Sequence, residues 1–258
     1  MYLKTIDFAR YASIRVGQPE EVLMIERGDT IPAERYLIGG ANNLLISSSP
    51  PPMMMLGKDF ATIQLQDRLL TIGASMPTGR VVSFARRHNL ADFEFFAKLP
   101  GTVGGMLAMN AGVKSYEIFN ILHSVEIDGR WIASGEIEHG YRFASLPGIV
   151  TAARFETKEG FDPELLKELT ALRSNQPKEP SAGSAFKNPP GDYAGRLIEA
   201  VGLKGERRGG MAWSDMHANF LVNLGGGNFE EAKYLLELAK ERVYETFGIE
   251  LQEEIKIL

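Results

Sequence analysis

The chain has 258 residues, a formal net charge of −5 and no cysteine. A chain of this length buries about three-quarters of its unfolded surface, so its core needs no disulfide. The missing thiols exclude disulfides, thiolate metal sites and cysteine nucleophiles. Because 33 acidic residues outnumber 28 basic ones, we expect no nucleic-acid partner.

The N-terminal stretch MYLKTIDFARYASIRVG has neither a long apolar core nor a small-residue cleavage site, so it is not a secretory signal. No run approaches the roughly 20 apolar residues that span a bilayer. We therefore expect a cytoplasmic protein that does not bind a membrane.

Short apolar segments predict β-strands along the first half of the chain. They lie at residues 36–38, 69–72, 125–127 and 149–155. Few helical patterns occur between them. The sequence therefore predicts an α+β fold with a strand-rich first half.

A first helix is predicted after residue 77, with Thr78 as its cap. Val81, Val82 and Ala85 follow at the spacing of one buried helix face. Asn89 is a stop signal. This segment therefore predicts a helix with one face toward a core.

Two further helices are predicted, and the helix-rich C-terminal third looks like a separate layer. Asp162 is a cap with proline at the first helical position, and leucines follow at helical spacing. These are Leu165, Leu166, Leu169 and Leu172. Asn228 and Glu231 form a capping box, and Gly248 ends that helix. Its apolar stripe is Ala232, Leu235, Leu236, Ala239 and Val243. Residues 249–258 return to a strand pattern.

Two boundaries divide the chain. The proline-rich loop 48–52 leads into apolar residues and predicts a hinge between a first small domain and a second. The polar segment 156–162 predicts a second boundary. No repeat of fixed period is present.

Residues 36–47, YLIGGANNLLIS, carry a first glycine-rich turn between two apolar runs. Small residues leave backbone N–H groups able to surround an anionic oxygen. The same pattern also suits an ordinary tight turn. It is not a Walker loop, because no Gly-Lys-Ser/Thr follows.

Residues 98–112, KLPGTVGGMLAMNAG, form a second and denser cluster of backbone-permissive residues. A hydroxyl and an amide accompany the glycines, which suits a loop that contacts phosphate. The alternative is a bulged strand that enters a helix.

Residues 181–191, SAGSAFKNPPG, place Ser184 between small residues, with Lys187 and Asn188 close behind. No G-x-S-x-G elbow is present, so a hydrolase serine is a poor interpretation. A hydroxyl can donate a proton to a developing carbanion when a partner supplies charge. Taken alone, Ser184 is more typical of a hydrogen-bonding residue in a loop.

Arg142 and Glu254 complete the candidates, although neither is singled out by its own pattern. Arg142, taken alone, is typical of a solvated surface arginine. Period-2 alternation places Glu254 on the solvated side of a closing strand, and nothing favours it over Glu253. The four histidines show no ligand spacing, so we expect no metal site, and we expect His217 to be a structural hydrogen-bonding residue.

The segments, in this order, resemble the UDP-N-acetylenolpyruvoylglucosamine reductase family. The resemblance runs from about Tyr11 to the C-terminus. It rests on YASIRVG, YLIGGANNLLIS, LPGTVGGMLAMNAG, GYRFAS, PSAGSAFKNP, AGRLIEAVGLKG, HANFLVN and FGIELQEEIKIL. PGTVGG alone is shared with a wider set of flavin-binding proteins.

The resemblance implies three small α+β domains, two of them FAD-binding domains of the type shared with vanillyl-alcohol-oxidase-like proteins. The expected first domain is residues 1–57, completed by a C-terminal strand within 248–258. The second is 58–157, and a substrate-binding domain follows at 158–247.

The family's activity implies a non-covalently bound FAD, NADPH as co-substrate, and an enolpyruvyl sugar nucleotide as substrate. The product enters peptidoglycan synthesis, and through it cell shape and division. Hydride passes from NADPH to the flavin and then to the vinyl C3. In that chemistry, a serine matching Ser184 protonates C2, and Arg142 and Glu254 stabilise the enolate-like charge.

The resemblance also assigns binding residues. Lys187 and Asn188 match the segment that meets the uridine and diphosphate, and Tyr141 shapes the wall beside the flavin. The expected FAD-binding residues are Arg15, Gly39, Gly40, Ala41, Asn42, Asn43, Leu44, Pro100, Gly101, Thr102, Gly104, Gly105 and Asn110. We expect a monomer.

The chain departs from the family's usual pattern at several positions. Ala41 and Asn42 replace a glycine and a serine, and alanine lacks glycine's freedom at positive φ. The serine after Arg142 is shifted by one, to Ser145. The chain also lacks the inserted tyrosine-bearing loop of longer members, which places it in a compact subgroup.

Two alternatives stay open. One is another flavoprotein of the same FAD-binding architecture, such as an oxidase of small alcohols, which would have no use for SAGSAFKNP or the closing FGIELQEEIKIL. The other is a non-catalytic binder of flavin or sugar nucleotide, which would tolerate loss of Ser184 and Glu254.

Overall fold

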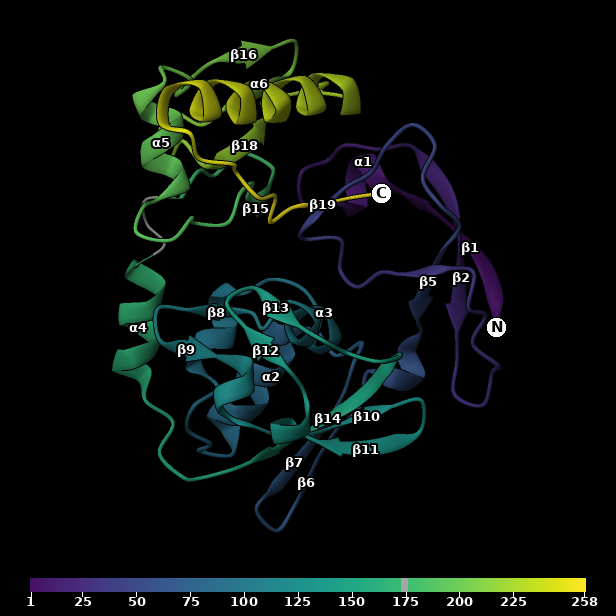
Figure 1. Cartoon of the computed structure of the whole chain (residues 1–258). Helices are drawn as coiled ribbons and strands as arrows, with labels where there is room; N and C mark the ends of the chain where they lie inside the picture. Colours follow the sequence, from purple (N-terminus) through teal and green to yellow (C-terminus); the bar gives the residue numbers. More distant parts are fainter. Residues whose placement is uncertain (173–175) are drawn as a thin grey trace. The chain divides into compact units, whose positions relative to one another are not determined.

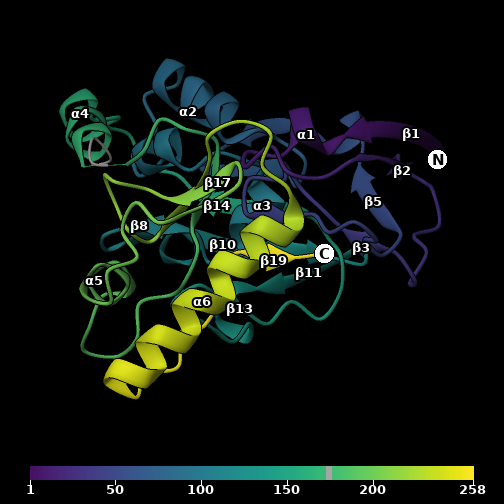
Figure 2. The same ribbon diagram turned by 90° about the horizontal axis from the view of Figure 1, so that it is seen from above.

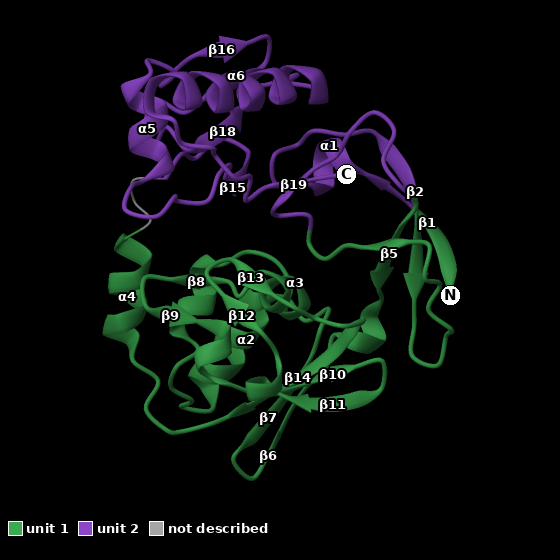
Figure 3. Cartoon of the chain, viewed as in Figure 1, with its two compact units in different colours: residues 1–4, 22–40, 52–174 green, residues 5–21, 41–51, 175–258 purple. Residues whose placement is uncertain are grey.

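The computed structural model describes residues 1–172 and 176–258 and combines several β-sheets with packed helices (Figure 1). The predicted α+β fold is confirmed. The chain divides into two compact units (Figure 3): unit 1 comprises residues 1–4, 22–40 and 52–174, and unit 2 comprises residues 5–21, 41–51 and 175–258. One change of unit, at 51/52, falls inside the predicted hinge loop. The division into three domains stays a prediction.

Unit 1 contains a five-stranded antiparallel sheet. Its order is β11 (Arg130–Ala133), β10 (Leu122–Ile127), β14 (Val150–Glu156), β7 (Leu69–Gly73) and β6 (Ile63–Gln66). The strands predicted around 69–72, 125–127 and 149–155 are confirmed by β7, β10 and β14, each of which has buried residues at consecutive positions and therefore on both faces.

A second group of strands in unit 1 is parallel. Residues 22–25 of β2 (Pro19–Ile25) and β3 (Tyr36–Leu37) pair with β5 (Met53–Leu56) on either side (Figures 1 and 2). β1 (Tyr2–Asp7) and α1 (Phe8–Tyr11) precede them in the chain. The strand predicted at 36–38 is therefore confirmed, and it leads directly into the first glycine-rich turn.

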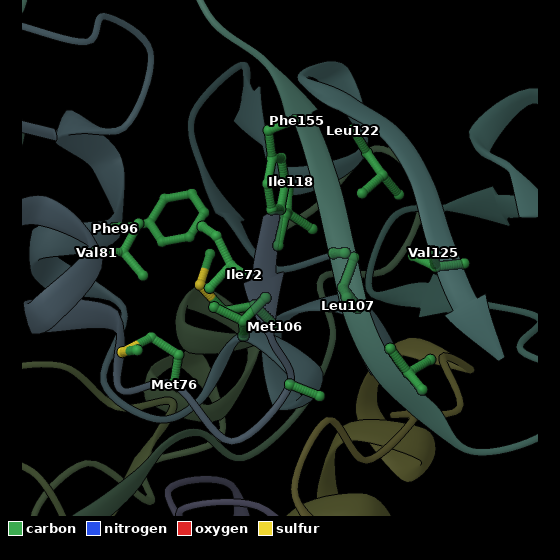
Figure 4. Packing of buried hydrophobic residues seen from close by; sticks show 14 of the residues in the cluster. Ile72, Met76, Val81, Phe96, Met106, Leu107, Ile118, Leu122, Val125 and Phe155 are labelled. Carbon is green, nitrogen blue, oxygen red and sulfur yellow. The ribbon is translucent and has the colours of Figure 1, made fainter. Parts of the chain in front are cut away.

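The core of unit 1 joins its sheet to two helices, α2 (Thr78–Arg87) and α3 (Val103–Ala108). Figure 4 shows Val81 of α2 and Met106 and Leu107 of α3 gathered with side chains of β7, β10 and β14. Val81 and Leu107 are fully buried. Because α3 is anchored through its apolar side, the glycine-rich segment that opens it is held at the surface of a rigid core.

The predicted cap of α2 is wrong by one residue. Pro77 is at the N-cap position and has no capping side chain, and Thr78 is the first helical residue. The backbone N–H of Thr78 donates to Gly101 O over 3.1 Å, so a distant segment satisfies the donor that a local cap would otherwise serve. The predicted stop is confirmed by Asn89, which has a φ of +53°.

α4 (Pro163–Ala171) begins as predicted, with the Asp162 carboxylate accepting from two backbone N–H groups of its first turn. The predicted leucine stripe is only partly buried. Leu169 is buried, whereas Leu172 lies beyond the helix and is 39% exposed. A nine-residue helix at the unit's edge covers little core.

Unit 2 contains a four-stranded antiparallel sheet that the sequence did not predict in its helix-rich third. The order is β15 (Ser181–Ser184), β18 (Phe220–Asn223), β17 (Met211–Trp213) and β16 (Arg207–Arg208). α5 (Ala194–Ala200) and α6 (Phe229–Phe247) belong to the same unit, and α6 runs beside β16 and β17 (Figure 1). The capping box of α6, its buried stripe and its end at Gly248 are confirmed.

The closing segment differs from the predicted strand. Only β19 (Lys256–Ile257) is a strand, and it pairs in parallel with β4 (Leu44–Leu45). Residues 252–255 instead bond irregularly to 185–187. The closing segment therefore pairs with two separate segments, residues 44–45 and 185–187, and does not form the one continuous strand that the alternation predicts. In the described ranges, no helix is both long and apolar enough to cross a membrane.

Candidate active site

The two predicted glycine-rich segments meet inside unit 1. A Cβ atom on Gly39 would lie 2.8 Å from Thr102 Oγ1, closer than real Cβ contacts allow. Glycine at position 39 therefore permits the turn after β3 to approach the opening of α3. This contact joins residues that are more than 60 positions apart and that the family resemblance assigns to one cofactor.

The opening of α3 is fixed by its own residues and by Ala74, the residue that follows β7. Thr102 is the N-cap, and its Oγ1 accepts from Gly105 N over 3.3 Å. Gly104 N donates to Ala74 O over 2.8 Å, and a Cβ on Gly104 would lie 3.1 Å from the Ala74 side chain. Gly101 has a φ of +127°, a conformation that favours glycine. The second segment is thus a glycine-rich entry into a helix.

The turn at residues 39–43 keeps its shape without the usual third glycine. Ala41 is buried and takes a φ of +51°, which costs an alanine about 1 kcal/mol. Ala41 O accepts from Ser13 N, and Asn42 Nδ2 donates to Ser13 Oγ over 2.7 Å. Within the described part of the chain, the backbone N–H groups of Gly40 and Asn42 donate to no protein acceptor. The turn therefore presents hydrogen-bond donors.

Arg15 lies in unit 2 on another constrained turn. It is exposed and has a φ of +55°, which is rare for a residue with a long side chain. The buried amide of Asn223 holds this turn, because its Nδ2 donates to the carbonyls of Ile14 and Arg15, each over 3.1 Å. Asn223 thus fixes the backbone from which the Arg15 side chain projects.

Asn110, a predicted FAD-binding residue, uses its amide inside unit 1. It is fully buried. Its Nδ2 donates to Glu117 Oε2 over 2.8 Å and to Gly140 O over 3.0 Å, and its Oδ1 accepts from Phe119 N. This geometry favours a supporting role, in which Asn110 ties the end of α3 to the hairpin that carries Arg142.

Arg142 and Tyr141 form the two-residue turn between β12 (His139–Gly140) and β13 (Phe143–Ala144). Arg142 has a φ of +56°, its Nη2 donates to Gly112 O over 3.3 Å, and its guanidinium lies 5.1 Å from the centre of the Tyr141 ring. Gly112 belongs to a short hairpin of β8 (Gly112–Val113) and β9 (Tyr116–Glu117). The guanidinium is therefore restrained from two directions.

Ser184 ends β15 in unit 2, opposite Phe220 of β18. A register shift separates Ser181 from Ser184, and Gly183 has a φ of +81° at that point. Ser184 is half-buried, and its hydroxyl has no hydrogen-bond partner among the described residues. The bulge therefore turns the strand at Ser184, and the hydroxyl is available to an external acceptor.

Glu254 reaches the same strand from the chain's end. Its backbone N–H donates to Ala185 O over 2.8 Å, and its carbonyl accepts from Asn43 Nδ2 over 2.8 Å. Glu253 is bonded differently, since its carboxylate pairs with the Lys240 ammonium. The structure thus separates two neighbours that alternation could not rank, and it places Glu254 beside the residue that follows Ser184.

Lys187 and Asn188 continue the chain from this point. Lys187 N donates to Gln252 O over 2.8 Å. Asn188 Oδ1 accepts from Ala194 N, the first residue of α5. The loop between them and α5 is fixed by Asp192, whose carboxylate accepts from Tyr193 N and pairs with the Arg196 guanidinium. These bonds lower the pKa of Asp192 to about 2, the Arg196 hydrogen bond being the main cause.

Two buried asparagines that the sequence did not single out support unit 2, Asn219 and Asn223. Both lie in the otherwise apolar stretch HANFLVN, and amide side chains within an apolar run are the signal that could have revealed them. His217 is structural as predicted: its Nδ1 accepts from Asn219 N, its ring packs on Phe220, and burial lowers its pKa.

The predicted residues thus fall into two sets. Unit 1 carries Gly39, Gly40, Pro100, Gly101, Thr102, Gly104, Gly105, Asn110, Tyr141 and Arg142. Unit 2 carries Arg15, Ala41, Asn42, Asn43, Leu44, Ser184, Lys187, Asn188 and Glu254. Among the residues that the structure describes, no group of three or more histidine or acidic side chains could hold a metal ion.

Comparison with known proteins gives consistent matches. Residues 176–258 match the C-terminal domain of UDP-N-acetylenolpyruvoylglucosamine reductase. The curated enzyme of that name from Helicobacter hepaticus is 46% identical, with all of both chains covered. The one from Campylobacter jejuni RM1221 is 43% identical and covers 98% of this chain and 99% of its own.

A solved structure agrees over the same length. The crystal structure of UDP-N-acetylenolpyruvylglucosamine reductase (MurB) from Thermus caldophilus superimposes with a TM-score of 0.86. The two chains are 34% identical, and the match covers 100% of this chain and 99% of the other. Both units are therefore included in the likeness.

The ion pair in the loop before α5 predicts a measurable titration. In the folded protein, Asp192 should titrate at about pH 2 by carboxyl-carbon NMR, because Arg196 stabilises its charged form. Its contribution to stability is therefore present above about pH 4 and is lost as the pH falls toward 2. In Arg196→Gln, the midpoint should rise toward the ordinary value of 3.8. A wild-type midpoint near 3.8 would contradict this assignment.

Proposed function

The chain belongs to the UDP-N-acetylenolpyruvoylglucosamine reductase family, whose members are oxidoreductases of peptidoglycan precursor synthesis, and we propose that it converts UDP-N-acetylglucosamine enolpyruvate to UDP-N-acetylmuramate with NADPH. The observation that carries this proposal is the match over the whole chain. It includes the segments that hold Arg142, Ser184 and Glu254, and not only a shared cofactor-binding fold.

We propose FAD as the non-covalent cofactor, and the residues present fit it. A dinucleotide diphosphate requires N–H donors on backbone that a ligand can approach closely. The turn at 39–43 offers such donors, and the Gly39–Thr102 contact leaves no room for a side chain beside them. The holding residues would be Arg15, Gly39, Gly40, Ala41, Asn42, Asn43, Leu44, Pro100, Gly101, Thr102, Gly104 and Gly105, with Asn110 supporting. When bound, FAD supplies the hydride chemistry between NADPH and the vinyl carbon.

Ser184 holds the proton that the substrate needs. Reduction of the enolpyruvyl double bond adds a hydride at C3 and a proton at C2. The Ser184 hydroxyl, which has no partner among the described residues, donates that proton as general acid. Its place at the end of a bulged, tightly bonded strand gives it a defined direction.

Arg142 and Glu254 bind the substrate carboxylate, onto which negative charge spreads before the proton arrives. The guanidinium of Arg142 offers two parallel donors that match a carboxylate. In this proposal the Glu254 carboxyl acts in its protonated form, whose O–H donates a hydrogen bond to the same group. Because both side chains sit on restrained backbone, the charge is stabilised with little reorganisation.

The remaining assigned residues bind the rest of the substrate. The Lys187 ammonium pairs with the diphosphate, and the Nδ2 of Asn188, whose Oδ1 already caps α5, donates to the same region. The half-exposed ring of Tyr141 forms part of the wall beside the flavin. We further propose a cytoplasmic monomer, since the reaction consumes NADPH and a nucleotide sugar and the chain carries no cysteine for an oxidising compartment.

The proposed reaction is tested by flavin absorbance under anaerobic conditions. Purified protein loaded with FAD should bleach on addition of NADPH. One equivalent of UDP-N-acetylglucosamine enolpyruvate should then restore the oxidised spectrum. Bleaching without return would indicate another flavoenzyme. A protein that takes up no FAD would favour the non-catalytic binder.

Replacement of Ser184 by alanine separates proton donation from cofactor chemistry. The Ser184→Ala variant should keep FAD and its NADPH oxidation, but should form product about 10²- to 10⁴-fold more slowly, the usual worth of a positioned general acid. Ser181→Ala, on the same strand, is the matched control and should keep wild-type turnover. Equal rates in the two variants would remove Ser184 from the mechanism.

Arg142→Lys tests the two-donor contact without changing the charge. The lysine ammonium cannot reproduce parallel donors, so kcat should fall by about 10- to 150-fold, as expected when a charge-assisted hydrogen bond of about 1.5–3 kcal/mol is lost. Backbone strain at positive φ is the same for both residues, which keeps the comparison clean. Arg130→Lys, on the exposed strand β11, should leave kcat unchanged. A near-native kcat in Arg142→Lys would refute the assigned role.

A further inference from the structure

Asn219 bonds to the chain two residues after Ser184 with both ends of its amide. Its Nδ2 donates to Phe186 O over 2.8 Å, and its Oδ1 accepts from Phe186 N over 3.0 Å. The side chain is 3% exposed, so these two bonds form away from water. An amide that bonds to both backbone groups of one residue imitates a neighbouring strand.

The hydrogen bonds of the Asn219 side chain begin where the regular pairing of β15 with β18 ends. β15 pairs with β18 only as far as Ser184, which lies opposite Phe220. Beyond that point Ala185 N donates to Asn219 O over 2.8 Å, and the Asn219 side chain then serves the next residue. Without that side chain, the peptide groups of the buried Phe186 would have no partner on this side. Asn219 therefore extends the sheet past the bulge.

The opposite side of the same segment is held by the end of the chain. Ala185 O accepts from Glu254 N over 2.8 Å and from Ile255 N over 3.3 Å, and Lys187 N donates to Gln252 O. Residues 185–187 are thus clamped between Asn219 and the closing segment. The backbone of Ser184 adjoins one end of this clamp, and the backbone of Glu254 is part of its far side.

We propose that Asn219 is a positioning residue for catalysis: by clamping residues 185–187, it sets the place of the Ser184 hydroxyl and of Glu254 relative to each other. The inference rests on the roles proposed above for these two side chains. Proton donation requires donor and acceptor within hydrogen-bond distance, and a displacement of about 1 Å can cost 10²-fold in rate. Asn219 itself touches neither substrate nor cofactor in this proposal.

Asn219→Asp is the sharpest test, because it changes one atom and keeps the shape. The acceptor for Phe186 N remains, but the donor facing Phe186 O becomes a second acceptor. We expect kcat to fall by about 10- to 100-fold while KM changes by less than about threefold. Flavin reduction by NADPH should be unchanged, and the loss should appear only in flavin reoxidation by UDP-N-acetylglucosamine enolpyruvate.

Asn228→Ala is the matched control for lost stability. It removes the capping amide of α6 in the same unit and should lower Tm by about 2–4 °C, with wild-type kcat. A similar fall of kcat in Asn228→Ala would mean that general loosening of unit 2, and not the clamp, slows the enzyme.

A double-variant comparison distinguishes positioning from simple support. In a Ser184→Ala background, Asn219→Asp should lower kcat by a clearly smaller factor than in the wild type, because one of the two groups that Asn219 positions is already absent and only the part that acts through Glu254 remains. If the two losses multiply instead, Asn219 does not act through Ser184 and the inference is wrong.

A measurement independent of activity follows the clamp directly, and it also serves if Asn219→Asp does not fold. In Asn219→Ala, the Phe186 amide loses its acceptor and should exchange hydrogen at least about tenfold faster, while amides of β17 keep their protection. Unchanged exchange at Phe186 would overturn the inference. If the reduced flavin of the wild-type protein is never reoxidised by the substrate, the proposed function and this inference are both wrong. If the wild type and Asn219→Asp both turn over normally, only this inference is wrong.

Discussion

The arrangement of unit 2 depends on the hydrogen bonds made by the last seven residues of the chain. Gln252 and Glu254 bond to the segment after Ser184, Lys256 N donates to Asn43 O, and Leu258 N donates to Leu45 O. Ser47 N then donates to Leu258 O. One short segment thereby joins an N-terminal turn to the C-terminal sheet. Two stretches that the family resemblance assigns to cofactor and substrate share a common support.

Four of the nine non-glycine residues with a positive φ angle are residues assigned to the site. Arg15, Ala41, Asn110 and Arg142 all adopt the left-handed region, where a side chain costs about 1–2 kcal/mol. Such conformations persist only where the surroundings determine them, and each of the four has identifiable bonds that do so. The pattern agrees with backbone that is held ready for a ligand, and Ala41 shows that this turn does not require glycine.

Local signals were the predictable part of the fold. The capping box of Asn228 and Glu231, the Asp162 cap and the stop at Asn89 act over a few residues, so the sequence alone contains all partners. Thr78 was misplaced because its N–H bonds to Gly101. The closing strand was over-extended because its partners lie at residues 44–45 and 185–187.

The clamping role of Asn219 was invisible, since the amide and its partner are 33 positions apart. Alternation could not prefer Glu254 to Glu253 either, because the partners that distinguish them lie far away in the sequence, at Ala185 and Asn43 for Glu254. The resemblance predicts which residues form the site, and the structure shows which bonds hold them.

The closing segment also has a consequence for biosynthesis. β4 is made early, yet its parallel partner β19 follows more than 200 residues later. Contacts of such long sequence separation form slowly, because a large loop must close before any bond is gained. On the ribosome, unit 2 cannot complete these hydrogen bonds until residues 252–258 have been made and have emerged. Until then, Asn43 and the segment after Ser184 lack the partners that residues 252–258 provide. This interval is when the protein is most open to aggregation and to chaperones.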